Sequence, residues 1–175
     1  MDSKRIQGKT IAILIANGVN DYLLNITKHA LEAEGASIRV LAMNAGSVVA
    51  AKNNNIPVDY AMSLANPDVF DALYIPGGRK SVEYLSLQKE ALDFVCSMYS
   101  AGKNIAVDDE GIELLERACL NNKLSSLTNN ELKANGIFVH TNAIPVVKHF
   151  IKAIAADYKI NDAVKSADEQ KAVLQ

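Results

Sequence analysis

The sequence predicts an α/β fold in which a central, mainly parallel sheet is covered by helices on both faces. Short apolar runs alternate along the chain with longer segments of helical periodicity. The first run, at residues 10–16, is apolar throughout, as expected for a strand buried on both faces. Because crossovers between parallel strands are right-handed, this alternation predicts a doubly wound, three-layer sandwich.

In the first half of the chain, predicted strands and helices alternate most clearly. Residues 10–16 are the first strand, and a helix is expected over residues 20–34, where Gly35 is a suitable stop. The segment "SIRVLAM" at 37–43 predicts the second strand. Residues 46–62 interrupt the rhythm with short strand-like pieces around a polar "KNNN" turn, which predicts a small hairpin or excursion.

The second half continues the same pattern. Apolar runs predict three more strands, and leucine, valine and isoleucine at helical spacing predict three more helices. In chain order these are a strand at 71–78, a helix at 88–101, a strand at 104–107, a helix at 112–120, a strand at 136–140 and a final helix that begins near Pro145.

Length and composition indicate one domain. We expect a polar N-terminal segment at 1–8, a single domain at 9–158 and a polar tail at 159–175. The net charge of −2 gives no electrostatic footprint for nucleic acid, and no apolar run is long enough to span a bilayer. Cys96 and Cys119 lack the spacing of metal ligands. We therefore expect a cytoplasmic protein without a nucleic-acid or membrane partner and without a metal or cofactor of its own.

Functional sites in such folds lie where the parallel strands end. Three of these ends carry polar or glycine-rich turns, which read "ANGVND", "PGGRKS" and "VDDEG". The backbone N–H groups of Gly77 and Gly78 are candidate donors to an oxyanion, although two glycines also suit an ordinary tight turn. His140 ends the last strand at the same edge and is a candidate binding residue.

The acidic turn consists of Asp108, Asp109 and Glu110. It precedes a helix, where the helix dipole favours negative charge, and we prefer this structural interpretation. A hydrolytic carboxylate pair and a divalent-metal site remain as alternatives.

Four segments fall at the ends and turns described above, and they read "TIAILIANGVNDYLL", "VFDALYIPGG", "NIAVDDEGIELL" and "GIFVHTNAIPVVKHFIKAIA". Together they resemble the PfpI/ThiJ superfamily, whose members have a flavodoxin-like, class I glutamine amidotransferase-like sandwich. Active members carry a cysteine on a sharp strand-to-helix turn, the nucleophile elbow, usually as A-I-C-x-G-P. The resemblance places Asp109 at that cysteine, Glu110 after it, and Gly111 at the glycine, whereas Ile112 replaces the proline. It also places Asn20 where active members have a glutamate. The resemblance therefore implies a vestigial elbow.

Within the superfamily, "DDEGIELL" resembles the C-terminal domain of large-subunit haem catalases. That branch implies a non-catalytic accessory domain with a role in assembly stability, substrate access, hydrogen peroxide response or chaperone-like binding. Haem and peroxide decomposition would belong to a separate domain. The implied partners are a second copy of the chain in a homo-oligomer, a catalase haem domain, or unfolded client proteins.

Two alternatives accompany this interpretation. One is a hydrolase, deglycase or amidase-like enzyme with Asp109 as nucleophile or base and Gly77 and Gly78 as the oxyanion hole. The other is a small-molecule or anion-binding module that uses the same cleft. We also expect Arg79, a candidate binding residue, or Lys80 either to pair with Asp109 or to face solvent.

Overall fold

The computed structural model describes residues 4–108, 110–119, 124–140 and 147–156. Within these residues the main sheet has six strands, in the spatial order β5-β2-β1-β6-β7-β8, and all neighbouring strands are parallel. In chain order they are β1 (Thr10–Leu14), β2 (Ser37–Ala42), β5 (Tyr60–Ala61), β6 (Ala72–Ile75), β7 (Asn104–Asp108) and β8 (Ile137–His140). The predicted flavodoxin-like α/β fold is confirmed.

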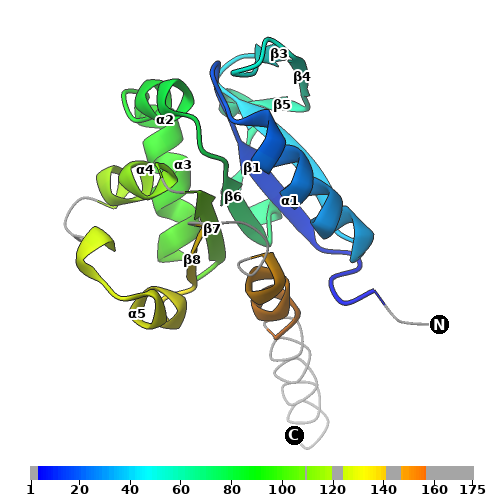
Figure 1. Ribbon diagram of the computed structural model, residues 1–175, viewed down its shortest axis with the longest axis vertical. Helices are drawn as coiled ribbons and strands as arrows, with labels where there is room; N and C mark the ends of the chain where they lie inside the picture. The colour runs from blue at the N-terminus through cyan, green and yellow to red at the C-terminus, as the bar shows by residue number, and fades with distance from the viewer. Residues whose placement is uncertain (1–3, 109, 120–123, 141–146, 157–175) are drawn as a thin grey trace, which may run out of the picture.

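Helices cover both faces of this sheet (Figure 1). The helix α1 and the helical residues 147–156 pack on one face, and α2, α3 and α4 pack on the other. The bounds are α1 (Asp21–Ala33), α2 (Arg79–Leu85), α3 (Lys89–Ser100), α4 (Gly111–Ala118) and α5 (Asn129–Ala134), with short 3-10 turns at Met62–Leu64, Pro67–Val69 and Leu124–Ser126.

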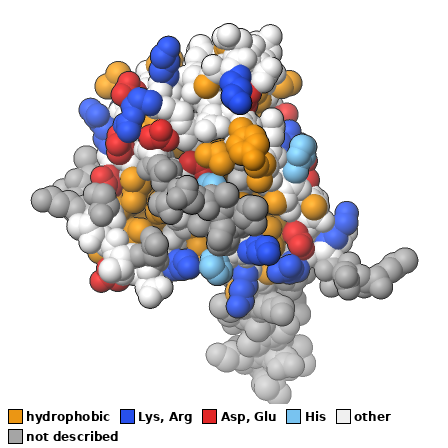
Figure 2. Space-filling model, viewed as in Figure 1, with side chains coloured by type: hydrophobic (Ala, Val, Ile, Leu, Met, Phe, Trp, Pro, Cys, Tyr) orange, Lys and Arg blue, Asp and Glu red, His pale blue; other side chains and the backbone are white. Residues whose placement is uncertain are grey.

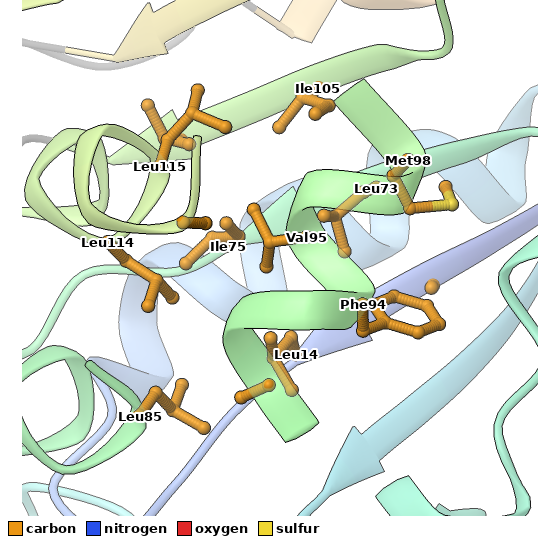
Figure 3. Close-up of a cluster of buried hydrophobic side chains, with 14 of the residues drawn as sticks. Leu14, Leu73, Ile75, Leu85, Phe94, Val95, Met98, Ile105, Leu114 and Leu115 are labelled. Carbon is orange, nitrogen blue, oxygen red and sulfur yellow. The ribbon is translucent and has the colours of Figure 1, made fainter. Parts of the chain in front are cut away.

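Each central strand contributes side chains to two separate cores. In β1, Ala12 and Leu14 face the cluster that includes α3 and α4, whereas Ile11 and Ile13 face α1. Figure 3 shows the first cluster, in which Leu14 lies near residues of α3 such as Val95. Because both faces are covered, residues 11–14 of β1 and all of β6 are buried and apolar, which explains why their sequence lacks polar alternation.

The helix α1 begins and ends where local chemistry requires. Asn20 is its N-cap, and its Oδ1 accepts a hydrogen bond from the Leu23 N–H at 3.2 Å. Leu24, Thr27 and Leu31 lie on its buried face. The chain leaves the helix at Gly35, whose φ of 96° is a conformation that favours glycine.

The excursion at residues 46–62 is a hairpin followed by an edge strand. The strands β3 (Gly46–Val49) and β4 (Asn55–Val58) pair antiparallel, separate from the main sheet, and β5 then joins the edge of the main sheet beside β2. The turn between β3 and β4 includes Asn53 at a φ of 64°, which asparagine tolerates better than most residues.

The structure contains two helices that the sequence pattern did not predict. The helix α2 begins within "PGGRKS", directly after Gly78, and buries Val82 and Leu85. The helix α5 starts with a capping box between Thr128 and Glu131.

The chain ends are described in part. Ile6, inside the expected polar segment 1–8, is buried, and its N–H donates to the Glu34 carbonyl at 3.1 Å. The expected start of the last helix near Pro145 and the expected tail at 159–175 lie outside the described residues.

Candidate functional site

The carboxyl ends of β6, β7 and β8 meet at one edge of the sheet. The register pairs Asp108, the last residue of β7, with His140, the last residue of β8. The elbow follows at once, since α4 begins at Gly111. A Cβ at Gly111 would lie 3.1 Å from the Ile75 carbonyl oxygen and 3.0 Å from the Val107 Cβ, so this turn packs tightly against the sheet. The tight packing explains why a glycine occupies this position.

Asp108 is the centre of a buried hydrogen-bond network. Its Oδ2 accepts from the Tyr74 hydroxyl at 2.7 Å and from the Gly77 N–H at 2.8 Å. Its Oδ1 lies 3.2 Å from Nδ1 of His140, which donates in the tautomer that suits a carboxylate acceptor. The side chains of Asp108 and His140 are 2% and 9% exposed. Among the described residues, Nε2 of His140 is buried without a hydrogen-bond partner.

Burial is the largest cause of the pKa shifts of Asp108 and Tyr74. It raises the pKa of Asp108, although the hydrogen bonds from Gly77 and Tyr74 and the proximity of His140 act in the opposite direction. Burial and the nearby Asp108 carboxylate raise the pKa of Tyr74 far above its usual value, although hydrogen bonding to Thr27 acts in the opposite direction. Tyr74 therefore stays a neutral phenol and acts as a hydrogen-bond donor, which is a structural role.

Gly77 and Gly78 lie between the elbow and the start of α1. The Gly77 N–H donates to Asp108, and the Gly78 N–H donates to Oε2 of Glu110 at 3.3 Å. The Gly77 carbonyl accepts from the Asn20 N–H at 2.8 Å. The two backbone N–H groups that were expected as oxyanion donors thus each have a carboxylate partner within the chain, and their role as oxyanion donors stays a prediction.

Arg79 lies at the surface beside α4. Its guanidinium forms an ion pair of 2.7 Å with Glu113, and both side chains are about half exposed. Hydrogen bonding to Glu113 raises the pKa of Arg79, and the nearby Glu110 and Glu83 act in the same direction. Asp109 lies outside the described residues, so the expected pairing of Arg79 or Lys80 with Asp109 is untested, as is the placement of Asp109 at the elbow.

A cavity of about 790 Å³ opens beside the elbow. It is bounded by the ends of β1 and β2, the β3–β4 hairpin and the start of α2, and Glu110 is its contribution from the elbow. Asn20, Gly78 and Arg79 also line it, whereas Asp108 and His140 do not. The predicted site residues therefore divide between a buried network and an open cavity, with Glu110 and Gly78 at the boundary.

The Cys119 thiol is a poor nucleophile. Cys96 and Cys119 are free and partly buried. Burial raises the pKa of Cys119 to about 12, and the neighbouring Cys96 adds to the effect. Within the described part of the chain, no three histidine, cysteine or acidic residues gather in a way that could hold a metal ion. The described helices also include none that is long and apolar enough to cross a membrane.

Sequence reasoning did not identify the Tyr74–Asp108 pair. Tyr74 lies within an apolar strand, where an aromatic residue signals packing. Asp108 was assigned to an acidic turn, although it is the last residue of β7. One signal could have indicated that Asp108 is buried. Asp108 lies two residues after Ala106, and alternate residues of a strand share a face, so Asp108 points to the same covered face of the sheet as Ala106.

The family model and the curated relatives both point to DJ-1/PfpI proteins. The model of the DJ-1/PfpI family matches residues 9–125. A deglycase of Pyrococcus abyssi is 33% identical over 105 residues, which are 60% of this chain and 63% of that protein. Deglycase PfpI of Pyrococcus furiosus is 31% identical over 105 residues, with the same coverage of 60% and 63%. The chain thus spans less than two thirds of the length of these curated relatives.

Catalases match as well, over a smaller share of their length. Catalase HPII of Mycobacterium avium is 31% identical over 124 residues, which are 70% of this chain and 18% of that protein. Catalase-2 of Bacillus subtilis is 26% identical over 113 residues, which are 65% of this chain and 16% of that protein. The resemblance is therefore confirmed at the level of the superfamily, and the deglycases match better than the catalase branch to which the sequence was assigned.

Solved structures share the fold. Oxidized DJ-1 of Toxoplasma gondii superposes with a TM-score of 0.69 at 15% identity and covers 93% of this chain and 98% of its own. DJ-1beta of Drosophila melanogaster superposes with a TM-score of 0.64 at 16% identity, covering 91% and 97%. These structures show that the fold is shared, and the family model, which matches more than half of the chain, shows that the chain belongs to the DJ-1/PfpI family.

Proposed function

We propose that this chain is a DJ-1/PfpI domain that works without a nucleophilic thiolate, as an accessory domain of the kind that resembles the C-terminal domain of large-subunit catalases. The observation that carries the proposal is the occupation of the Gly77 and Gly78 N–H groups by the carboxylates of Asp108 and Glu110. Two internal anions at these donors disfavour the binding of a substrate oxyanion there.

The residue types agree with this proposal. Covalent catalysis needs an activated nucleophile, and the position that resembles the family cysteine is Asp109. Asn20, at the position of the family glutamate, uses its Oδ1 to cap α1. The high pKa of Cys119 makes it no substitute. An accessory domain would stabilise an assembly, shape access to another domain or bind a protein partner, and any haem would belong to that other domain.

A second candidate has stronger support from the comparisons. In it, the chain is a PfpI-type enzyme, such as a deglycase, that uses carboxylates in place of the thiolate. The curated deglycases match over 63% of their length, against 18% for the Mycobacterium avium catalase. The specific structural observation is that Glu110 is partly exposed and lines the cavity, where a general base could reach a bound substrate.

Turnover assays separate the two candidates. The purified chain is incubated with glycated amino acids, small aldehydes, peptides and amides, beside Asp109→Ala, Glu110→Gln and the exposed control Glu90→Gln. The accessory-domain proposal predicts no turnover above background for any of these proteins. Turnover that disappears in Glu110→Gln or Asp109→Ala but persists in Glu90→Gln would establish the carboxylate enzyme instead.

An accessory role also implies an assembly. We propose that the chain forms a homo-oligomer in solution, and light scattering at several concentrations measures its mass against the 18.9 kDa of one chain. A constant mass of one chain at all concentrations would contradict this part of the proposal.

A further inference from the structure

The cavity beside the elbow lies at the same edge of the sheet as the buried network, and the predicted site residues Asn20, Gly78, Arg79 and Glu110 line it. Its volume of about 790 Å³ falls within the range of roughly 300–1,000 Å³ typical of small-molecule sites. It contains neither Tyr74 nor Asp108 nor His140. The residues that give it its chemistry come mainly from the β1–α1 loop, the β3–β4 hairpin and α2.

The wall formed by the hairpin is fixed in place by hydrogen bonds to the β1–α1 loop. The Gly18 N–H donates to the Val49 carbonyl at 2.8 Å, and the Val49 N–H donates to Oδ1 of Asn17 at 3.0 Å. The Ala51 N–H donates to the Val19 carbonyl at 2.9 Å. These bonds hold the two sides of the cavity together, so a ligand would meet a site that is already formed.

Two asparagines of the β1–α1 loop present amide donors at the cavity. Oδ1 of Asn17 accepts from the Val49 N–H, and Oδ1 of Asn20 accepts from the Leu23 N–H. These bonds fix the amide orientation and leave each Nδ2 as a donor without a hydrogen bond among the described residues. Amide donors of this kind suit hydroxyl, carboxylate or phosphate oxygens.

Two of the cations at the cavity have no ion-pair partner among the described residues. Lys52 and Lys80 line it and form no ion pair within the described residues, whereas Arg79 is paired with Glu113. Of the carboxylates that line it, Asp21 is buried and accepts from Nδ2 of Asn54, and Glu110 accepts from the Gly78 N–H. Figure 2 shows lysine, arginine and acidic side chains gathered over the α2 end of the molecule. The charged residues that line the cavity are three cations, Lys52, Arg79 and Lys80, and two acidic residues, Asp21 and Glu110, so their formal charge sums to +1.

We propose that this cavity binds a small polyhydroxylated anion of the sugar-phosphate or sugar-acid class. Lys52 and Lys80 meet the anionic group, and the amide groups of Asn17 and Asn20 donate to oxygens of the ligand. Charge-assisted hydrogen bonds are the stronger ones, so the lysines supply most of the affinity and the amides the selectivity for hydroxyls. The site holds whether the chain is an accessory domain or an enzyme, since binding needs no elbow nucleophile.

Isothermal titration calorimetry tests the site with glucose 6-phosphate, gluconate, glucose and inorganic phosphate as probes. Binding of glucose 6-phosphate or gluconate at Kd below about 1 mM, at least tenfold tighter than glucose and inorganic phosphate, supports the proposal. Tighter binding of glucose 6-phosphate would indicate a phosphate ligand, and tighter binding of gluconate a carboxylate ligand. If inorganic phosphate binds as tightly as glucose 6-phosphate, the proposed recognition of the sugar hydroxyls is wrong. If neither glucose 6-phosphate nor gluconate binds, the proposed anion site is wrong.

Variants locate the binding. The double variant Lys52→Gln/Lys80→Gln is expected to weaken binding of the tighter anion at least tenfold, whereas Lys152→Gln, an exposed residue of the helical segment 147–156, leaves it unchanged. Asn20→Asp keeps the N-cap of α1 but replaces the amide donor with a carboxylate, and is expected to weaken binding similarly. Thermal denaturation confirms that each variant is folded. Unchanged affinity in the double variant would place the anion elsewhere and refute the site.

Discussion

Replacing Asp108 with alanine tests the buried network directly. The substitution removes the acceptor of three donors, at 2.7 Å from Tyr74, 2.8 Å from Gly77 and 3.2 Å from His140. A buried donor left without a partner costs about 1–3 kcal/mol. Because water can enter the space of the lost carboxylate, the lower end applies to each donor, and the expected loss is about 3–5 kcal/mol of the free energy of unfolding.

Asp108→Asn is the matched control. Its Oδ1 still accepts from the Gly77 N–H, and its Nδ2 can donate to the other tautomer of His140. The expected loss is therefore smaller, about 1–2 kcal/mol. Urea denaturation at pH 7, followed by far-ultraviolet circular dichroism, measures both values from the midpoints and slopes. A loss below about 1 kcal/mol for Asp108→Ala would refute the network as a source of stability.

The pH dependence gives an independent test of the same residue. Because burial raises the pKa of Asp108 in the folded state, the folded protein binds the proton more tightly than the unfolded chain. The stability that this group contributes is full below its unfolded pKa, near 3.8, and is lost as the pH rises through the folded pKa. The advantage of the wild type over Asp108→Asn should therefore shrink as the pH rises above the unfolded pKa. An advantage that grows with pH would mean that the three hydrogen bonds outweigh burial.

Three further substitutions separate the tight turn, the network and the surface. Gly78→Ala should lower the free energy of unfolding by about 2 kcal/mol or more, because its φ is 118° and an added Cβ would clash with the Gly18 carbonyl oxygen. The control Gly102→Ala, with a φ of 74° and nothing within 4 Å of the added Cβ, should lose only about 1 kcal/mol, and equal losses in urea denaturation would contradict the packing argument. Tyr74→Phe should lose about 1–2 kcal/mol by removing one donor to Asp108, which a double-mutant cycle with Asp108→Asn checks through its coupling. Arg79→Ala should leave the thermal midpoint unchanged, since its ion pair with Glu113 is exposed, and a clear drop in Tm would show that the pair is structural.

The order of strands and helices was predictable because the core is apolar on both faces of the sheet. The runs at 10–16 and 104–107 contain the observed β1 and most of β7, and the β3–β4 hairpin lies in the predicted excursion. The start of α2 was not predicted, because a proline and two glycines precede it and dominate the local signal. The helix α5 is only six residues long, too short for periodicity, although "TNNE" carries its capping box.

The candidate site was predictable in its location but not in its contacts. The strand ends identified Gly77, Glu110 and His140 as neighbours at one edge, because parallel strands end together. That the Gly77 N–H donates to Asp108 depends on the register of β6 against β7 and on the geometry of the turn, which sequence alone does not specify. The cavity likewise depends on how the hairpin docks on the β1–α1 loop.

The central proposal is that the elbow of this DJ-1/PfpI domain is not a catalytic site. The most direct measurement is the steady-state turnover of glycated amino acids and small aldehydes by the purified wild-type chain, beside Glu110→Gln. The account predicts that both proteins show only the background rate. Turnover by the wild type that is lost in Glu110→Gln would contradict the account and make this chain a carboxylate-dependent enzyme of the family.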